Sequence, residues 1–158
     1  MFLKMLPGLS KHYKNNPDSL LSKIFGVFTV KTRATSSVHL MLMENVLQIK
    51  NPEGLRYIFD LKGSLVDRKV KGKTKPSTTL KDVNYLMATA ASPNFISLEE
   101  PRLKNLAQIV RKDVRFLSDL GLMDYSLLLA IETLESGADT ENGGRVSLVK
   151  RTDSSEVH

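Results

Sequence analysis

The sequence predicts a domain of the α+β class, which combines β-strands with α-helices. Three segments rich in β-branched and aromatic residues, 24–31, 37–46 and 55–62, predict strands. Apolar residues recur at helical spacing over residues 98–120, which predicts one long helix. An apolar run follows this helix, so residues 123–133 predict a further strand.

The first 23 residues predict a helix followed by a turn. Residues 2–15 have helical spacing, which Pro7-Gly8 is expected to interrupt. Asn16-Pro17 then resets the chain, with Asn as N-cap and Pro as the first helical residue of a short turn over 18–22. The expected result is a short helical entry to the first strand.

The next segment predicts strands and then a long loop. Residues 32–36 would link the strands 24–31 and 37–46 as a hairpin loop. A third antiparallel strand is expected after the turn-forming residues 51–54. Residues 63–79 have no apolar period and predict a loop, and loops of that length are usually functional or disordered. A short helix is expected at 80–89.

The helix predicted at 98–120 has a start signal and a stop signal. Ser97 and Glu100 have the spacing of a capping box, and Gly121 is the expected C-terminal stop. Its apolar stripe predicts burial of four side chains, those of Leu106, Val110, Val114 and Leu117. Beyond the following strand, the sequence predicts a polar loop at 136–144, a possible strand at 146–150 and a frayed end at 151–158.

Composition limits the classes of site that the chain can carry. The 158 residues fit one domain or a piece of a larger one, and 41% apolar content is enough for a core. Absence of Cys excludes disulfides and thiolate metal sites, and the three His lack ligand-like spacing. The longest apolar runs, about five residues, are far below the ~18 that a membrane span needs. We therefore expect a soluble intracellular protein.

Positive charge is concentrated in one segment. The net charge is +6, and residues 60–81 contain seven Lys or Arg against two Asp. A localised basic segment indicates an anion-binding surface, for nucleic acid, anionic lipid or phosphate, although a solvated Lys-rich loop explains it as well. Nucleic acid is the weakest of these readings, because the segment has no aromatic residue on which a base could stack.

Asp124 is the candidate catalytic residue. It lies between a Gly-ended helix and an apolar strand, where a carboxylate needs either a partner or a task. A kinase requires such a group to position and deprotonate the attacking hydroxyl. Lys62 and Arg68 flank a Gly-Ser turn, and Lys81 ends the same basic segment, so all three could bind phosphate. Neither of the common glycine-rich phosphate-binding motifs is present in the sequence.

Several stretches in the right order resemble the phosphatidylinositol phosphate kinase family. The most specific are Asp60-Leu61-Lys62-Gly63-Ser64 and the hexapeptide MDYSLL at 123–128. The other matching stretches are Leu6-Pro7, Asn16-Pro17-Asp18-Ser19-Leu20-Leu21, Gly26-Val27-Phe28, Met43-Glu44-Asn45, Arg68, Leu80-Lys81-Asp82 and Asp113 with Phe116-Leu117. Together they cover roughly residues 2–133.

The resemblance implies a fold and a set of roles. The fold is a variant of the protein kinase fold, an antiparallel sheet plus helices, here incomplete at both ends. Asp124 would be the catalytic carboxylate, and Lys62, Arg68 and Lys81 would face the phosphates of the inositol headgroup. Glu44-Asn45-Val46 would connect the two lobes and meet the adenine of ATP through the backbone. Members are peripheral enzymes at cytosolic membrane faces, where a basic surface favours docking.

Residues 1–135 are therefore expected to form the central part of such a kinase domain, with 136–158 as loop, possible strand and tail. By this resemblance, the family's nucleotide loop, ATP-binding Lys, metal-binding Asp and activation loop lie outside the chain. The expected activity is ATP- and Mg²⁺-dependent phosphorylation of a phosphatidylinositol phosphate, on the 5-hydroxyl of the 4-phosphate lipid, with little activity for the chain alone. The alternative is a non-catalytic phosphoinositide-binding or regulatory fragment. The oligomeric state cannot be predicted.

Overall fold

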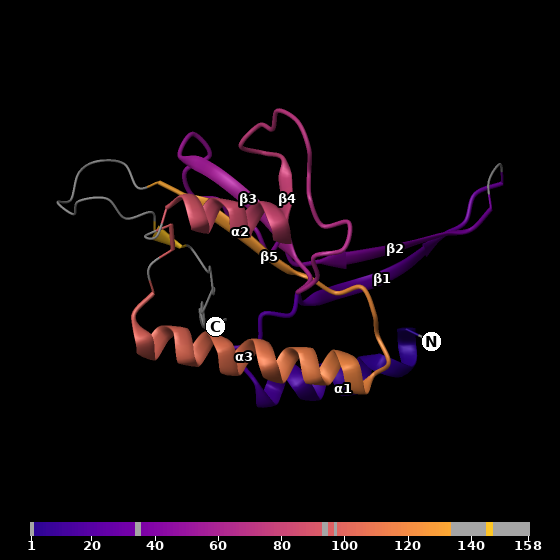
Figure 1. The fold of residues 1–158 in the computed structure, drawn as a ribbon. Coiled ribbons are helices and arrows are strands. Elements are labelled where there is room, and N and C mark those ends of the chain that lie inside the picture. Colours follow the sequence, from indigo (N-terminus) through magenta and orange to yellow (C-terminus); the bar gives the residue numbers. More distant parts are fainter. Residues whose placement is uncertain (1, 34–35, 93–94, 97, 134–144, 147–158) are drawn as a thin grey trace.

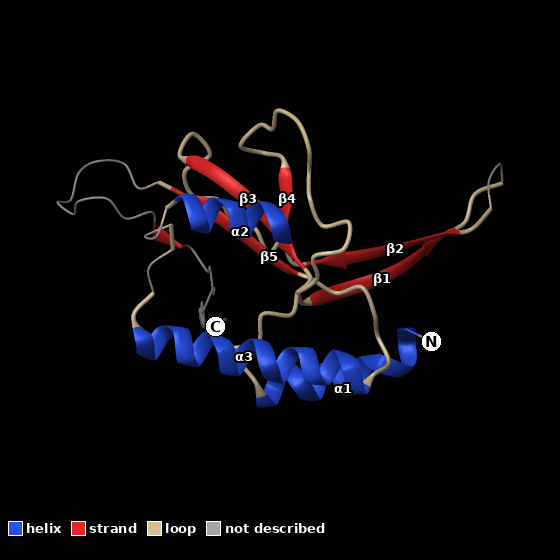
Figure 2. Cartoon of the chain, viewed as in Figure 1, coloured by secondary structure: helices blue, strands red, loops and turns tan. Residues whose placement is uncertain are grey.

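A computed structural model describes residues 2–33, 36–92, 95–96, 98–133 and 145–146. Its helices are α1 (Phe2–Asn15), α2 (Asp82–Ala91) and α3 (Glu100–Asp119). Its strands are β1 (Ile24–Val30), β2 (Val38–Met43), β3 (Leu55–Leu61), β4 (Thr79–Lys81), β5 (Leu127–Glu132) and β6 (Arg145–Val146). Figures 1 and 2 show α1 and α3 below, the sheet that contains β3 and β5 above, and the β1–β2 hairpin extending to one side.

The predicted hairpin is confirmed, and the predicted place of the third strand is wrong. β1 pairs with β2 in the antiparallel sense, from Ile24 opposite Met43 to Val30 opposite Val38. β3 does not join them, because it lies between β4 and β5 in a second sheet of order β4-β3-β5-β6. This sheet is mixed rather than antiparallel, since β3 runs parallel to β4 and antiparallel to β5.

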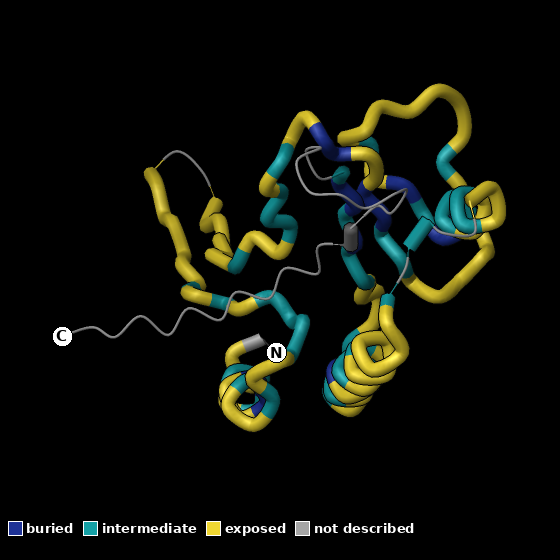
Figure 3. The backbone as a smooth tube through the Cα atoms, turned by 90° about the vertical axis from the view of Figure 1, so that its left-hand side faces the viewer, coloured by how far each residue is buried: buried dark blue, intermediate teal, exposed yellow. Residues whose placement is uncertain are grey.

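The core lies where α2 covers the second sheet. Phe59 is fully buried and forms a cluster with Leu80, Leu129 and Ile131. Aromatic rings extend this cluster, because Phe59 meets Tyr85 edge-on with the ring centroids 5.4 Å apart. In Figure 3, which is coloured by residue burial, the buried residues gather mainly in the upper part of the view, where this sheet lies, with others on the helices below. The core therefore holds β3 and β5, whose ends carry the candidate site, at fixed register.

Three helix predictions need correction, one in the interior of a helix and two at the start of a helix. Pro7 lies inside α1, in its second turn, and the helix continues through it, although Pro cannot donate the hydrogen bond that an N–H at this position would make to the Leu3 carbonyl. α2 begins at Asp82, after a short strand, β4, that the sequence did not predict. α3 begins at Glu100 with Glu99 as N-cap, while Ser97 lies outside the described residues. Gly121 does end α3: its φ is +67°, and Leu122 N–H donates to the Leu117 carbonyl at 3.1 Å.

The apolar stripe of α3 is less buried than predicted. Leu106, Val110 and Leu117 are half-buried, and Val114 is 39% exposed. Val110, Val114 and Leu117 line a pocket and so meet open space on one side. α3 also lies beside α1, where the rings of His12 and Phe116 stack at 4.2 Å between centroids.

The end of the chain can be compared with prediction at only a few positions. The strand predicted at 123–133 is shorter, because β5 begins at Leu127. The loop predicted at 136–144 and the frayed end at 151–158 lie outside the described residues, as does most of the strand predicted at 146–150. Among the described helices, none combines the length and the apolar character that crossing a membrane requires.

Candidate functional site

The candidate site forms where β3 ends and β5 begins. Leu61, the last residue of β3, lies opposite Leu127, the first residue of β5. Antiparallel pairing therefore brings the residues that follow Leu61 close to those that precede Leu127. The Lys62 ammonium donates to the Asp124 carboxylate, across 62 positions of sequence. The structure thus unites the two motifs that the sequence analysis considered most specific.

Asp124 is an exposed, ionised carboxylate on a strained turn. Its φ is +66°, in the left-handed region that Asp tolerates better than most residues. Its side chain is 82% exposed, so a substrate can reach it. The hydrogen bond and charge of Lys62 hold the pKa of the Asp124 carboxyl below its ordinary value of 3.8. Asp124 therefore carries its negative charge at neutral pH and can accept a proton or orient a hydroxyl.

Asp82 organises the loop around this pair, a role that the sequence analysis missed. Its buried carboxylate accepts hydrogen bonds from the backbone N–H groups of Lys62, at 3.0 Å, and Gly63, at 2.8 Å. It also accepts one from Arg68 Nε at 2.8 Å. The sequence singled out Asp82 only as a member of the matching stretch Leu80-Lys81-Asp82, and its local signal was an acidic residue at the start of a helix, where the helix dipole favours negative charge anyway.

Arg68 is buried against two carboxylates. Besides its bond to Asp82, its guanidinium contacts the backbone carbonyl of Asp60 and lies 3.5 Å from the Asp60 carboxylate. The hydrogen bond with Asp82 raises the pKa of Arg68, which stays charged. One oxygen of Asp60, Oδ1, is buried without a hydrogen-bond partner among the described residues. Arg68 therefore shapes the loop through Asp60 and Asp82. Because its side chain is buried, little of it is open to a phosphate.

Lys81 lies at the end of β4, opposite Asp60 across the parallel pair. It is half-buried, and its ammonium reaches the Asp67 backbone carbonyl at 3.5 Å, the longest distance that a hydrogen bond allows. This weak contact leaves the Lys81 charge available to an anion. Lys69, Lys71, Lys73 and Lys75 are exposed in the loop between β3 and β4.

The linker segment, residues 44–46, follows β2 and is fixed at its first residue. Glu44 N–H donates to the Lys23 carbonyl at 2.8 Å, and the Glu44 carbonyl accepts from Ser22 Oγ at 2.9 Å. Among the described residues, neither Asn45 nor Val46 uses its backbone N–H or carbonyl group in these contacts. If the segment meets a base through its backbone, those two residues are better placed to do so than Glu44.

A pocket of about 660 Å³ extends from the linker segment to Lys62 and Gly63. These two residues begin the loop between β3 and β4, which we call the Lys62 loop. This volume is within the range of small-molecule sites, roughly 300–1,000 Å³. Its lining residues come from the turn after α1, the linker and the chain after it, the end of β3, α3 and β5. They include Glu44, Asn45, Val46, Lys62, Gly63, Asp113 and Glu132. Asp124, Arg68 and Lys81 are outside this lining and lie along the Lys62 loop instead.

The fit of the two expected cofactors differs. The pocket has room for part of a nucleotide, and the linker supplies backbone donors and acceptors at its wall. No group of three or more His, Cys, Asp or Glu that could hold a metal ion occurs in the described part of the chain. The described residues therefore do not provide a ligand set for Mg²⁺.

Comparison with known proteins gives the same family as the motifs. The family model for phosphatidylinositol-4-phosphate 5-kinase matches residues 1–158. The chain is similar to phosphatidylinositol 4-phosphate 5-kinase type-1 beta of Gallus gallus, with 33% identity over 144 residues, 89% of the chain and 25% of that protein. It is also similar to a probable phosphatidylinositol phosphate kinase of Dictyostelium discoideum, with 33% identity over 129 residues, 80% of the chain and 17% of that protein.

The human relative gives the same result at slightly lower identity. Phosphatidylinositol 4-phosphate 5-kinase type-1 alpha of Homo sapiens is 30% identical over 134 residues, 84% of the chain and 23% of that protein. The chain thus spans a quarter or less of the length of these three relatives. With the family model matched along its whole length, the chain belongs to the phosphatidylinositol-4-phosphate 5-kinase family.

Proposed function

We propose that the chain is the central part of a kinase domain that transfers the γ-phosphate of ATP to an inositol hydroxyl of a phosphatidylinositol phosphate. The observation that carries this proposal is the contact between Lys62 and Asp124 beside the pocket that the linker lines. This contact places an ionised carboxylate, which can orient a hydroxyl, next to a cation, which can bind phosphate. Family membership agrees with this chemistry.

Asp124 would orient the attacking inositol hydroxyl and accept its proton. Phosphoryl transfer relies mainly on positioning and charge stabilisation, so a carboxylate with a lowered pKa is adequate for this role. The Lys62 ammonium, which is already beside Asp124, would offset the negative charge of the phosphate as it approaches. Because the Asp124 side chain is exposed, a headgroup can reach it without any rearrangement of the described core.

Lys81 and Arg68 would bind the phosphate that the lipid already carries. Lys81 has the more available charge, whereas Arg68 is buried with its guanidinium on Asp82 and Asp60, so only its remaining N–H groups would reach a phosphate. We assign the headgroup to phosphatidylinositol 4-phosphate and the acceptor to its 5-hydroxyl, in line with the names of the relatives. The exposed lysines of the same loop would favour an anionic membrane surface, so we place the protein in the cytoplasm, peripheral to cytosolic membrane faces.

Adenine would lie against the linker segment, where the backbone groups of Asn45 and Val46 are the better candidates for its hydrogen bonds. The apolar wall of the pocket, from α3 and β5, would exclude water from the base. ATP would supply the transferred phosphoryl group, and Mg²⁺, when bound, would neutralise the charge of its phosphates.

Two preparations test the proposal. The first is the 158-residue chain, in which binding of ADP and of soluble inositol 1,4-bisphosphate is measured by calorimetry. The second is a hybrid kinase, in which the chain replaces the matching segment of the Gallus gallus relative, assayed for phosphorylation of phosphatidylinositol 4-phosphate. We expect both ligands to bind and the hybrid to be active. Headgroup binding without nucleotide binding, and an inactive but folded hybrid, would indicate a non-catalytic phosphoinositide-binding fragment instead.

A further inference from the structure

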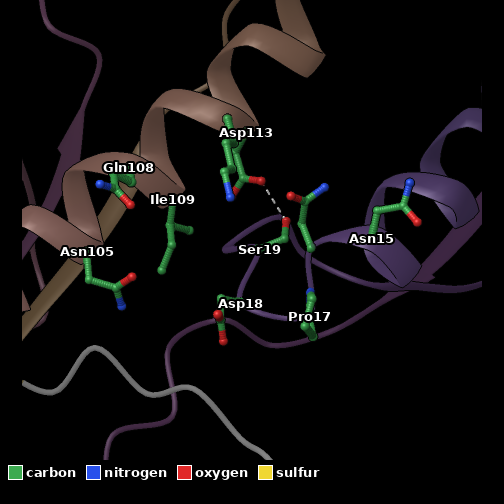
Figure 4. A pocket seen from close by; sticks show the side chains of 10 residues that line it. Asn15, Pro17, Asp18, Ser19, Asn105, Gln108, Ile109 and Asp113 are labelled. Atoms are coloured by element: carbon green, nitrogen blue, oxygen red, sulfur yellow. Dashed lines mark hydrogen bonds between the residues drawn. The ribbon is translucent and has the colours of Figure 1, made fainter.

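Asp113 is a buried carboxylate on α3 that the proposed chemistry does not use. It is 4% exposed, and its two carboxylate oxygens have three close polar partners. His12 Nε2 lies at 2.7 Å and Ser19 Oγ at 2.8 Å from Oδ1, while Leu20 N–H donates to Oδ2 at 2.7 Å. Figure 4 shows Asp113 reaching from α3 to Ser19 in the turn after α1. Asp113 thus ties α1, this turn and α3 together.

The turn that Asp113 holds is hydrogen-bonded to the first residue of the linker segment, Glu44. Ser22 Oγ donates to the Glu44 carbonyl at 2.9 Å, and Glu44 N–H donates to the Lys23 carbonyl at 2.8 Å. Lys23 N–H also donates to the Glu44 side chain at 3.3 Å. Only one residue, Leu21, separates Leu20, which is bound to Asp113, from Ser22, which is bound to Glu44. The position of the Asp113 carboxylate therefore influences the position of the Glu44 backbone through a short stretch of chain.

Tyr13 secures the same stretch from α1. Its hydroxyl donates to the Ser22 carbonyl at 2.6 Å. Burial raises the pKa of the Tyr13 hydroxyl, and the charges of Glu44 and Asp113 raise it further, so the group stays protonated as a donor. Ser22 is therefore fixed on its carbonyl side by α1 and on its hydroxyl side by the linker.

A second buried carboxylate holds the chain beyond the linker. Glu132, at the end of β5, is 5% exposed and accepts from Lys50 N–H at 3.1 Å and Asn51 N–H at 2.8 Å. Asp113 and Glu132 both line the pocket that contains the linker. Asp113 thus secures the turn that is hydrogen-bonded to Glu44, and Glu132 secures the chain shortly after the linker.

We propose that Asp113 is a positioning residue for nucleotide binding, which sets the backbone of the linker segment through Ser19, Leu20 and Ser22. The inference deepens the proposed function and depends on it, because it assigns the nucleotide to the linker. Burying a carboxylate is costly unless its oxygens are satisfied. Two of the three partners of Asp113, Ser19 and Leu20, lie in the turn whose Ser22 donates to the linker carbonyl of Glu44. A preorganised backbone binds its ligand without first losing conformational freedom.

The alternative is that Asp113 only stabilises the contact between α1 and α3. Both roles would lower the melting temperature when the carboxylate is changed. They differ in ligand binding below that temperature, because a purely structural role leaves the affinity of the folded molecules unchanged. They also differ in selectivity, because headgroup binding at Lys81 does not involve the linker.

The test uses Asp113→Asn in the 158-residue chain, with Asp119→Asn as matched control. Asp119 is an exposed Asp in the last turn of the same helix. Calorimetry measures binding of ADP and of inositol 1,4-bisphosphate, well below the melting temperature of each variant. We expect Asp113→Asn to weaken ADP binding about three- to tenfold, the effect of a modest coupling energy. Inositol 1,4-bisphosphate binding should not change, and Asp119→Asn should bind both ligands like the wild type.

Ser22→Ala tests the path, because it removes the hydrogen bond to the Glu44 carbonyl. If Asp113 acts through this bond, Asp113→Asn should weaken ADP binding less in the Ser22→Ala background than in the wild type. Unchanged ADP affinity in folded Asp113→Asn, or equal losses for both ligands, would overturn the inference and leave the proposed function standing. Failure of the wild-type chain to bind ADP, while it binds inositol 1,4-bisphosphate, would remove the nucleotide assignment itself.

Discussion

The ammonium of Lys62 contacts the carboxylate of Asp124, and this contact joins the end of β3 to the turn before β5. Lys62 was expected to face lipid phosphate, and the structure places it first beside the candidate catalytic group. Its side chain is 27% exposed and that of Asp124 is 82% exposed, so the pair lies at the surface. A phosphate that approaches the pair would meet the cation and the carboxylate together.

Lys62→Met should raise the pKa of Asp124 towards its ordinary value of 3.8, because Lys62 supplies the main cause of its depression. An NMR titration of the Asp124 carboxyl carbon between pH 2 and pH 7 measures this. Lys73→Met is the control, since Lys73 is exposed elsewhere in the same loop. If Asp124 titrates identically in the wild type and in Lys62→Met, the two side chains do not interact in solution.

Asp82→Asn should destabilise the protein in a pH-dependent way. Burial by itself raises the pKa of Asp82, and the hydrogen bonds from Arg68, Gly63 and Lys62 lower it by more, to a value below 3.8. The unfolded chain therefore binds the proton more readily, and the stability that Asp82 contributes is complete above about pH 4 and lost as pH falls through the folded pKa. We expect a loss of about 1.5–3 kcal/mol at pH 7, the value of a charged hydrogen bond.

Urea unfolding of the wild type and Asp82→Asn at several pH values between 2 and 7 checks this. The difference in their free energies of unfolding should shrink at the acid end. A difference that stays constant down to pH 2, or that grows there, would show that Asp82 is not held ionised by its partners.

Lys81→Ala should weaken binding to vesicles that contain phosphatidylinositol 4-phosphate about tenfold or more, if its ammonium meets the lipid phosphate. Lys73→Ala, which removes an exposed charge from the same loop, should cost much less on these vesicles. On vesicles of phosphatidylserine the two variants should lose binding to the same small extent. Equal losses for both variants on both vesicles would indicate a non-specific electrostatic surface, and Lys81 would have no special role.

Local patterns predicted the elements better than their partners. The composition of 24–31, 37–46 and 55–62 predicted three strands, because β-branched and aromatic residues are a local signal, and the structure has strands at 24–30, 38–43 and 55–61. The sheet to which β3 belongs depends on β5, more than sixty residues away, and no local pattern encodes that pairing. Likewise, the stripe on α3 predicted a helix correctly, while its burial depended on the pocket beside it.

The candidate site was predictable only as separate motifs. Lys62 and Asp124 were singled out from two stretches of sequence, and the register of β3 and β5 explains why they meet. Asp82 was missed, because its role depends on where the Lys62 loop folds back, and this is a tertiary relationship. The placement of Arg68 against Asp82 and Asp60 was hidden for the same reason.

The most direct test of the central claim is the turnover of Asp124→Asn in the hybrid kinase. Asn keeps the shape and tolerates the left-handed backbone of residue 124, but it removes the charge and the proton acceptor. Turnover should fall about 100-fold or more, the contribution of a general base, while affinity for ATP and lipid changes little. The melting temperature, measured on the same preparation, should stay near that of the unsubstituted hybrid, because the side chain is largely exposed. Asp119→Asn is the control, and an Asp124→Asn hybrid with normal turnover would contradict the account.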